Sequence, residues 1–201
     1  MLECKRVKTP CNGDFLQEIE ENSQVINLTE YQKVIGSLNH LAQHTQADIM
    51  YTVNQLSRYC TNPTGKNWIS LKHLLRYLKG TMAYNLIYNK CQSLSLISEL
   101  VGWEEADYEH AKEDCKSISG YLIQVYENPV CWLSKRQSAV AQSTTEAEYI
   151  SMSVCAKQMR WLSFVLQDIG QAIEKPTLFN DNSGTVIISK KASLNTNTKH
   201  I

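Results

Sequence analysis

Three short acidic islands in the second half of the chain carry residue types that do metal-assisted chemistry. They read Glu-Glu-Ala-Asp at 104–107, Thr-Glu-Ala-Glu-Tyr at 145–149 and Phe-Asn-Asp-Asn at 179–182. Each adjoins apolar residues at the end of an expected strand or the start of an expected helix, where a lone carboxylate is costly unless a cation holds it. Mg²⁺ prefers carboxylate oxygens, so the islands predict a two-metal site of the kind that cleaves phosphodiesters.

The elements that must position these islands follow an α/β order. Short apolar runs bounded by Asn, Gly and Pro predict strands, and a capping box at Ser143–Glu146 predicts the start of a long helix. The pattern predicts strands at 86–88, 94–101, 120–125, 130–133 and 177–179, a hairpin turn at 127–129, and helices at 143–170 and 182–191.

The first 90 residues have a different pattern. Residues 1–29 lack periodicity and predict an extended or loosely ordered lead-in, whereas residues 30–90 predict an all-helical segment. We expect helices at 31–44 after a Thr29 cap, from an Asp48 cap to about residue 61, and at 67–79 before Gly80. Neither segment contains a catalytic constellation of its own.

Basic residues on the third helix suggest a nucleic-acid interface. Lys72, Arg76 and Lys79 fall on one outward face, and Lys135 and Arg136 follow the hairpin. The plain alternative for both groups is a solvated surface. Trp103, Trp132 and Trp161 could stack on bases, but their strand and helix positions favour core packing.

Composition limits the class of protein. The chain has 201 residues, of which 43% are hydrophobic and 20% charged, with a net charge of zero, as in ordinary globular proteins. Seven cysteines without a C-x-x-C pair argue against a zinc ribbon and a complete disulfide framework, and so predict a reducing compartment. With neither a signal peptide nor an apolar run of spanning length, we expect an intracellular protein, cytoplasmic or nuclear, without a membrane partner.

The motifs resemble copia-type retrotransposon Pol polyproteins over nearly the whole chain. The first part, with Tyr31-Gln-Lys-Val-Ile-Gly-Ser-Leu and Leu75-Arg-Tyr-Leu-Lys-Gly-Thr81, resembles the helical region that follows the polymerase palm. The second part resembles the ribonuclease H domain of the same polyproteins, through the motifs Lys116-Ser-Ile-Ser-Gly-Tyr121, Trp132-Leu-Ser-Lys-Arg-Gln137, Ser143-Thr-Thr-Glu-Ala-Glu-Tyr149, Asp181-Asn182 and Thr198-Lys-His-Ile201.

The resemblance implies a ribonuclease H-like fold, that is, a mixed sheet with a central helix. It also implies an enzyme that cleaves the RNA strand of an RNA–DNA hybrid. The implied cofactor is Mg²⁺ or Mn²⁺, held as two ions about 4 Å apart. By motif position the catalytic acids are Glu105, Glu148 and Asp181, and Asp107 joins them as a metal ligand.

Two departures from the family pattern predict weak or absent nuclease activity. Glu105 stands where the family has aspartate, and the chain stops before the family's fourth acid, so the ribonuclease H-like segment 91–201 is expected to be C-terminally truncated. The polymerase aspartates are not in the sequence, and segment 30–90 is expected to be a reverse-transcriptase thumb or connection fragment. The implied partners are an RNA–DNA hybrid or other nucleic acid and the remaining Pol segments. The alternatives are a non-catalytic nucleic-acid-binding module and an exapted regulatory or effector protein.

Overall fold

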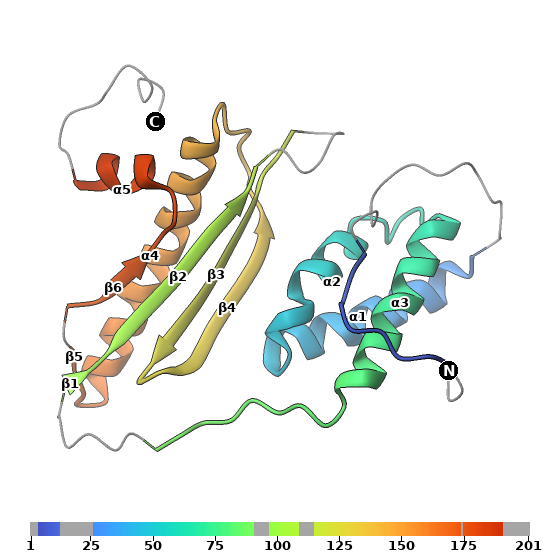
Figure 1. Ribbon diagram of the computed structural model, residues 1–201, viewed down its shortest axis with the longest axis horizontal. Coiled ribbons are helices and arrows are strands. Elements are labelled where there is room, and N and C mark those ends of the chain that lie inside the picture. Colours follow the sequence, from blue (N-terminus) through green and yellow to red (C-terminus); the bar gives the residue numbers. More distant parts are fainter. Residues whose placement is uncertain (1–3, 13–25, 91–96, 109–114, 174, 191–201) are drawn as a thin grey trace. The chain divides into compact units, whose positions relative to one another are not determined.

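The chain divides into two units, Met1–Leu86 and Ile87–Ile201, each with its own secondary structure (Figure 1). The computed structural model describes residues 4–12, 26–90, 97–108, 115–173 and 175–190. The family motif at Thr198–Ile201 lies outside the described residues. The functional division into segments 1–29, 30–90 and 91–201 stays a prediction.

The first unit is helical, as the periodicity predicted. It contains α1 (Leu28–His44), the 3₁₀ turn η1 (Ala47–Ile49), α2 (Met50–Ser57) and α3 (Gly65–Thr81). Apolar residues at helical spacing on each helix are buried, so the three helices share one core. Within that core the fully buried Tyr31 donates its hydroxyl hydrogen to the Leu56 carbonyl at 2.9 Å, which joins α1 to α2.

The helix ends differ from the predicted ones in three places. Asn27, rather than Thr29, caps α1 by accepting a hydrogen bond from the Glu30 amide. Asp48 caps no helix and instead accepts the Tyr77 hydroxyl hydrogen from α3. Gly80 lies inside α3, which ends at Thr81, because no left-handed residue interrupts the helix there.

The second unit confirms the predicted α/β class. Its strands are β1 (Ile97–Ser98), β2 (Leu100–Asp107), β3 (Ile118–Val125), β4 (Asn128–Arg136), β5 (Ala172–Ile173) and β6 (Thr177–Phe179), and its helices are α4 (Thr144–Asp168) and α5 (Ser183–Lys190). The main sheet has the order β4-β3-β2-β6, in which β2, β3 and β4 are antiparallel and β6 is parallel to β2. A separate parallel pair joins β1 to β5. This arrangement is consistent with a ribonuclease H-like fold.

Helix α4 runs along one face of the sheet and forms the core of the unit (Figure 1). Leu100, Ile123, Cys155 and Met159 are buried between the helix and the strands. Gly102 allows this close packing, because a Cβ atom there would lie 2.5 Å from Met159 Sδ. Ser143 caps α4 as predicted, since its hydroxyl accepts a hydrogen bond from the Glu146 amide at 3.1 Å.

The predicted hairpin is present, but its turn is displaced. Val125 pairs with Asn128, so the two-residue turn is Tyr126-Glu127 rather than residues 127–129. Both turn residues have positive φ, 49° and 63°, as a type I′ turn requires. The predicted strand at 86–88 is wrong, because these residues pair with no strand and Ile87 is 71% exposed.

Candidate active site

The candidate site lies where β2 extends beyond its neighbour β6. Strand β6 ends at Phe179 opposite Trp103, whereas β2 continues to Asp107. The segment after β6 therefore runs beside the second half of β2, and the N-terminal part of α4 lies against the same strand. Three side chains from these three segments meet there, namely Glu104, Glu148 and Asn180.

The Asn180 amide joins the two carboxylates. Its Nδ2 donates one hydrogen bond to Glu104 Oε1 and a second, at 3.1 Å, to Glu148 Oε2. Glu148 Oε2 also accepts from the backbone amide of Ala106 at 3.1 Å, which ties α4 directly to β2. Each carboxylate of the pair is thus held by a donor from another element.

Burial makes Glu104 an unusual acid. Its side chain is 7% exposed, and its Oε2 atom is buried without a hydrogen-bond partner among the described residues. Burial raises the pKa of Glu104 to about 7; the nearby Ser151 hydroxyl and the hydrogen bond from Asn180 oppose this rise, and the Glu148 and Asp181 charges add to it. Near neutral pH a large fraction of Glu104 therefore keeps its proton.

Glu148 shows the same balance of effects. Burial raises the pKa of Glu148, while its hydrogen bonds from Ala106 and Asn180 lower it. The Asp181 and Glu105 charges raise the pKa further. The carboxyl groups at positions 105 and 181 thus lie close enough to Glu148 to affect its proton affinity.

The predicted acids occupy different surroundings. Glu148 is buried in the site, whereas Glu105 and Asp181 are exposed beside it, and Asp107 is half-buried at the end of β2. Because side chains alternate along a strand, Glu104 and Glu105 point to opposite faces of β2, and Glu104 is the one on the face toward α4. The roles assigned to Glu105, Asp107, Glu148 and Asp181 stay predictions.

Sequence reasoning missed Glu104 and Asn180 as members of the site. Both stand within the acidic islands, but the family motif places its catalytic acids at the neighbouring positions Glu105 and Asp181. The alternation of Gly102, Glu104 and Ala106 was an available signal, because two small residues mark the face on which a helix packs closely.

The side chains of the site are of the type that binds a divalent cation, but they are not arranged as a metal-binding group. The donors are carboxylate oxygens, and the unpaired Glu104 Oε2 is a free ligand atom. Within the described ranges, however, no three His, Cys, Asp or Glu side chains gather as a group that could hold a metal ion. An amide lies between the two buried carboxylates instead.

A shallow pocket of about 540 Å³ opens beside these residues. It is lined by Trp103, Glu104, Glu105, Gly120, Tyr121, Leu122, Phe179, Asn180 and Asp181. The rings of Trp103 and Phe179 stack at its rim, with centroids 4.5 Å apart and planes 19° apart. They are 48% and 45% exposed, so the expected core packing of Trp103 is wrong. Trp161 is also exposed, whereas Trp132 is half-buried.

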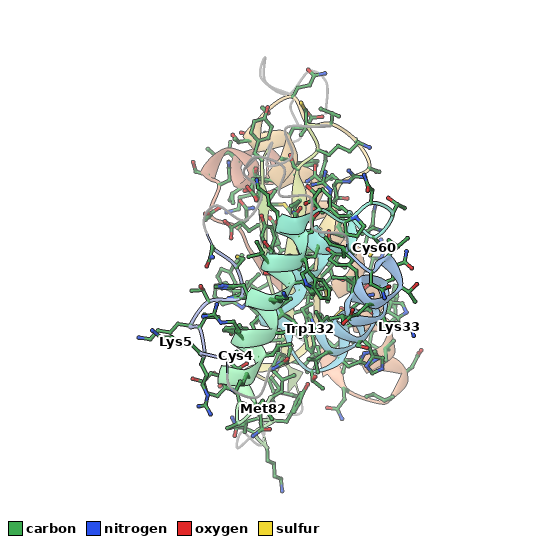
Figure 2. All side chains as sticks on the ribbon, turned by 90° about the vertical axis from the view of Figure 1, so that its right-hand side faces the viewer. Cys4, Lys5, Lys33, Cys60, Met82 and Trp132 are labelled. Atoms are coloured by element: carbon green, nitrogen blue, oxygen red, sulfur yellow. The ribbon has the colours of Figure 1, made fainter. Side chains whose placement is uncertain are left out.

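Basic side chains of α3 donate hydrogen bonds to the backbone of residues 4–9. Arg76 Nε donates to the Lys5 carbonyl at 2.6 Å, and Lys79 Nζ donates to the Cys4 carbonyl at 3.1 Å. His73 Nε2 donates to the Thr9 carbonyl at 2.9 Å. Figure 2 labels Cys4 and Lys5 next to α3.

Lys72, in contrast, lies over the Trp68 ring, with Nζ 5.4 Å from the ring centroid. The α3 side chains predicted to face phosphate therefore already have partners within the chain. Their role in binding nucleic acid stays a prediction.

At the end of β4, Lys135 and Arg136 are exposed, and their contacts with phosphate stay a prediction. The next residue, Gln137, is buried and connects two elements of the site. Its Nε2 donates to Ser119 Oγ on β3 at 3.0 Å and to the Ala147 carbonyl on α4 at 2.9 Å. Gln137 thus fixes the turn of α4 that carries Glu148.

Comparisons with known proteins place the chain in a family. It is 33% identical over its whole length to the retrovirus-related Pol polyprotein from transposon RE2 of Arabidopsis thaliana, and 32% identical to that from transposon TNT 1-94 of Nicotiana tabacum. The chain spans only 14% and 15% of those two polyproteins. It is also 34% identical over 133 residues to the secreted RxLR effector protein 161 of Plasmopara viticola, which covers 66% of this chain and 91% of that protein.

Other comparisons are negative: no family model and no solved structure matches the chain. Among the described helices, none is both long and apolar enough to cross a bilayer. The full-length similarity therefore carries the assignment. The chain belongs to the family of copia-type retrotransposon Pol polyproteins, and it corresponds to a small part of them.

Proposed function

We propose that the second unit is a ribonuclease H-like nuclease with weak or lost activity on the RNA strand of an RNA–DNA hybrid. The observation that carries the proposal is the convergence of Glu104 from β2 and Glu148 from α4, with Asp181 close enough to affect the pKa of both. Paired carboxylates of this kind are the usual protein contribution to metal-assisted phosphodiester cleavage.

Glu104, Glu148 and Asp181 are the residues that would hold Mg²⁺ or Mn²⁺. Such an ion would activate water and neutralise charge on the leaving oxygen. The chain itself orients Glu148 through the Ala106 amide and keeps Glu104 away from bulk water. Among the described residues, no three acidic side chains are assembled as a group that could hold a metal ion, which supports weak rather than full activity.

The test is cleavage of a labelled RNA–DNA hybrid by the full chain with millimolar Mn²⁺ or Mg²⁺. We expect slow, metal-dependent cleavage that Glu148→Gln abolishes. Asp168→Asn removes a carboxylate at the far end of α4, about 30 Å from Glu148 at 1.5 Å per residue, and should leave the rate unchanged. Cleavage by the purified chain at an unchanged rate after Glu148→Gln would refute the assignment.

The same assay decides which β2 acid takes part. Shortening Glu104 to aspartate withdraws the buried carboxylate from Glu148, whereas shortening Glu105 moves an exposed one. If Glu104 is the acid, Glu104→Asp changes the rate at least tenfold and Glu105→Asp changes it little. The opposite pattern supports Glu105, the acid that the family motif predicts.

A second candidate is a non-catalytic nucleic-acid-binding module. The exposed Trp103–Phe179 stack favours it, because aromatic rings at a pocket rim provide a platform for unpaired bases. Binding should then weaken steeply with salt, and Trp103→Ala should weaken it further. Affinity that does not depend on salt would exclude this role.

An exapted effector is the third candidate, favoured by the similarity to a protein named as a secreted effector. In that case protein partners should stay bound after nuclease treatment, and Glu148→Gln should not release them. Recovery of nucleic acid alone would argue against it.

For the Pol role, the proposed partners are the remaining Pol segments, which the relatives carry in one longer chain. An intracellular location stays a prediction.

A further inference from the structure

The strongest unexplained feature of the site is the group that separates its two buried carboxylates. Two acidic side chains brought together away from water are stable only if one is protonated or a positive or donor group lies between them. Here that group is the Asn180 carboxamide, whose two Nδ2 hydrogens go to Glu104 and Glu148. Within the described residues, no positively charged side chain is seen to take this place.

The orientation of the amide is fixed by its other end. Asn180 Oδ1 accepts a hydrogen bond from the Asn182 backbone amide at 2.8 Å, so its oxygen faces a donor and its nitrogen must face the carboxylates. Asn182 is itself held, because its Oδ1 accepts from the Thr185 amide in the first turn of α5. Thr185 Oγ1 donates to the Thr145 carbonyl of α4. The segment that carries Asn180 thus contacts both helices, and the backbone amide of Asn182 orients the Asn180 side chain.

The bridge leaves one atom unsatisfied. Asn180 reaches one oxygen of Glu104, whereas the second, Oε2, is buried without a partner in the described part of the chain. A buried carboxylate oxygen without a donor is costly, and an additional positive group would stabilise it. A hydrogen-bonding amide is therefore only a partial replacement for a cation.

We propose that Asn180 is a positioning residue that holds Glu104 and Glu148 together without metal, so that a divalent cation reaches the pair only by displacing this amide. The inference concerns the same carboxylates as the proposed function and extends it by naming the group that competes with the ion. It also accounts for the absence, among the described residues, of an assembled metal-binding group despite several neighbouring acids. It does not require that the chain cleave anything.

Two substitutions at Asn180 test the proposal through Mn²⁺ affinity, measured by titration calorimetry on the full chain. Asn180→Ala removes the competing amide, and Asn180→Asp replaces it with a carboxylate ligand. We expect both to bind Mn²⁺ at least fivefold more tightly than the wild type. Without metal, Asn180→Ala should melt at a lower temperature than the wild type, and added Mn²⁺ should restore much of the loss.

Asn182→Ala is the matched control. It loosens the cap of α5 in the same segment but keeps the backbone amide that orients Asn180 and touches neither carboxylate. Its Mn²⁺ affinity should equal that of the wild type. If Asn180→Ala binds Mn²⁺ no more tightly than Asn182→Ala, or if neither Asn180 variant binds Mn²⁺, the proposal is wrong.

A measurement on the wild type covers the case in which the variants do not fold. The Asn180 side-chain amide should exchange slowly with solvent without metal and faster at saturating Mg²⁺, as followed by nuclear magnetic resonance. Unchanged protection of this amide, whether or not Mg²⁺ shifts the signals around Glu148, would overturn the inference. Failure to cleave a hybrid would refute only the nuclease, because none of these readouts depends on cleavage.

Discussion

Gly102 on β2 lies directly against Met159 on α4, at a distance that leaves no room for a side chain. A Cβ atom at position 102 would stand 2.5 Å from Met159 Sδ and 3.1 Å from Cys155 Sγ. The neighbouring Glu104, on the same face of β2, reaches the Asn180 and Glu148 network because the helix comes this close. The spacing between strand and helix therefore matters for the site as well as for the core.

We predict that Gly102→Ala destabilises the second unit by about 1–3 kcal/mol, because the added methyl group overpacks the interface. Urea unfolding gives the free energy of unfolding. The cost should shrink in a Met159→Ala background, where the clash is relieved. Gly36→Ala in α1, where nothing lies within 4 Å of the new Cβ atom, should instead stabilise its helix by up to about 1 kcal/mol. Equal effects at the two glycines would contradict this account.

The raised pKa of Glu104 predicts a pH dependence of stability. The folded state holds the proton up to about pH 7, whereas an unfolded glutamic acid releases it near 4.5. The resulting stabilisation is complete below pH 4.5 and is lost as the pH rises toward 7. We expect a contribution on the order of 2–3 kcal/mol to disappear across this window, and Glu104→Gln to remove that dependence. Urea unfolding at pH 5 and pH 7.5 measures this change in the free energy of unfolding, and Asp168→Asn is the control. If the free energy of unfolding of Glu104→Gln changes between the two pH values as much as that of the wild type, Glu104 is not the cause.

Glu127 is predicted to be a strained turn residue. It has φ of 63° in the β3–β4 turn, a conformation that costs a residue with a Cβ atom about 1 kcal/mol. Glu127→Gly should therefore stabilise the second unit by about 0.5–1 kcal/mol, as measured by thermal or urea unfolding. The same change at Glu30, in the first turn of α1, should destabilise. Loss of stability at both positions would show that the turn is not strained.

The contact between α3 and residues 4–12 predicts a change in proteolysis. Arg76→Ala removes the hydrogen bond to the Lys5 carbonyl, so the segment should detach more often and be cut faster by trypsin after Lys5, Arg6 or Lys8. A charge-assisted hydrogen bond of about 1.5–3 kcal/mol corresponds to roughly a tenfold or greater rise in the rate. Lys72→Ala is the matched control, because Lys72 lies over Trp68. Equal rates in the two variants would contradict the contact.

Local patterns of the sequence predicted most of the fold. The helices of the first unit, the capped start of α4, the hairpin and the short β6 depend on residues within a few positions of each other, and all are present. Errors arose where tertiary contacts decide. Residues 86–88 have strand-forming side chains but no partner strand in the described part of the chain, and Gly80 stays inside α3 although glycine is common just after the end of a helix.

The site was harder to predict because it depends on which face of β2 meets α4. A shift of one residue exchanges Glu104 for Glu105, and a motif of neighbouring acids does not distinguish them. Asn180 carries no charge, so a search for carboxylates passes over it, although its two hydrogen bonds join the site. The packing of Gly102 under α4 shows which face of β2 meets the helix, and the choice between the two acids as catalytic residue stays a prediction.

The contacts of residues 4–12 with α3 also set an order of events during synthesis. Cys4 and Lys79 are 75 positions apart, and Thr9 and His73 are 64 apart. Residues 4–12 must therefore wait for α3 to leave the ribosome before they find these partners. Docking of residues 4–12 therefore follows the synthesis of α3.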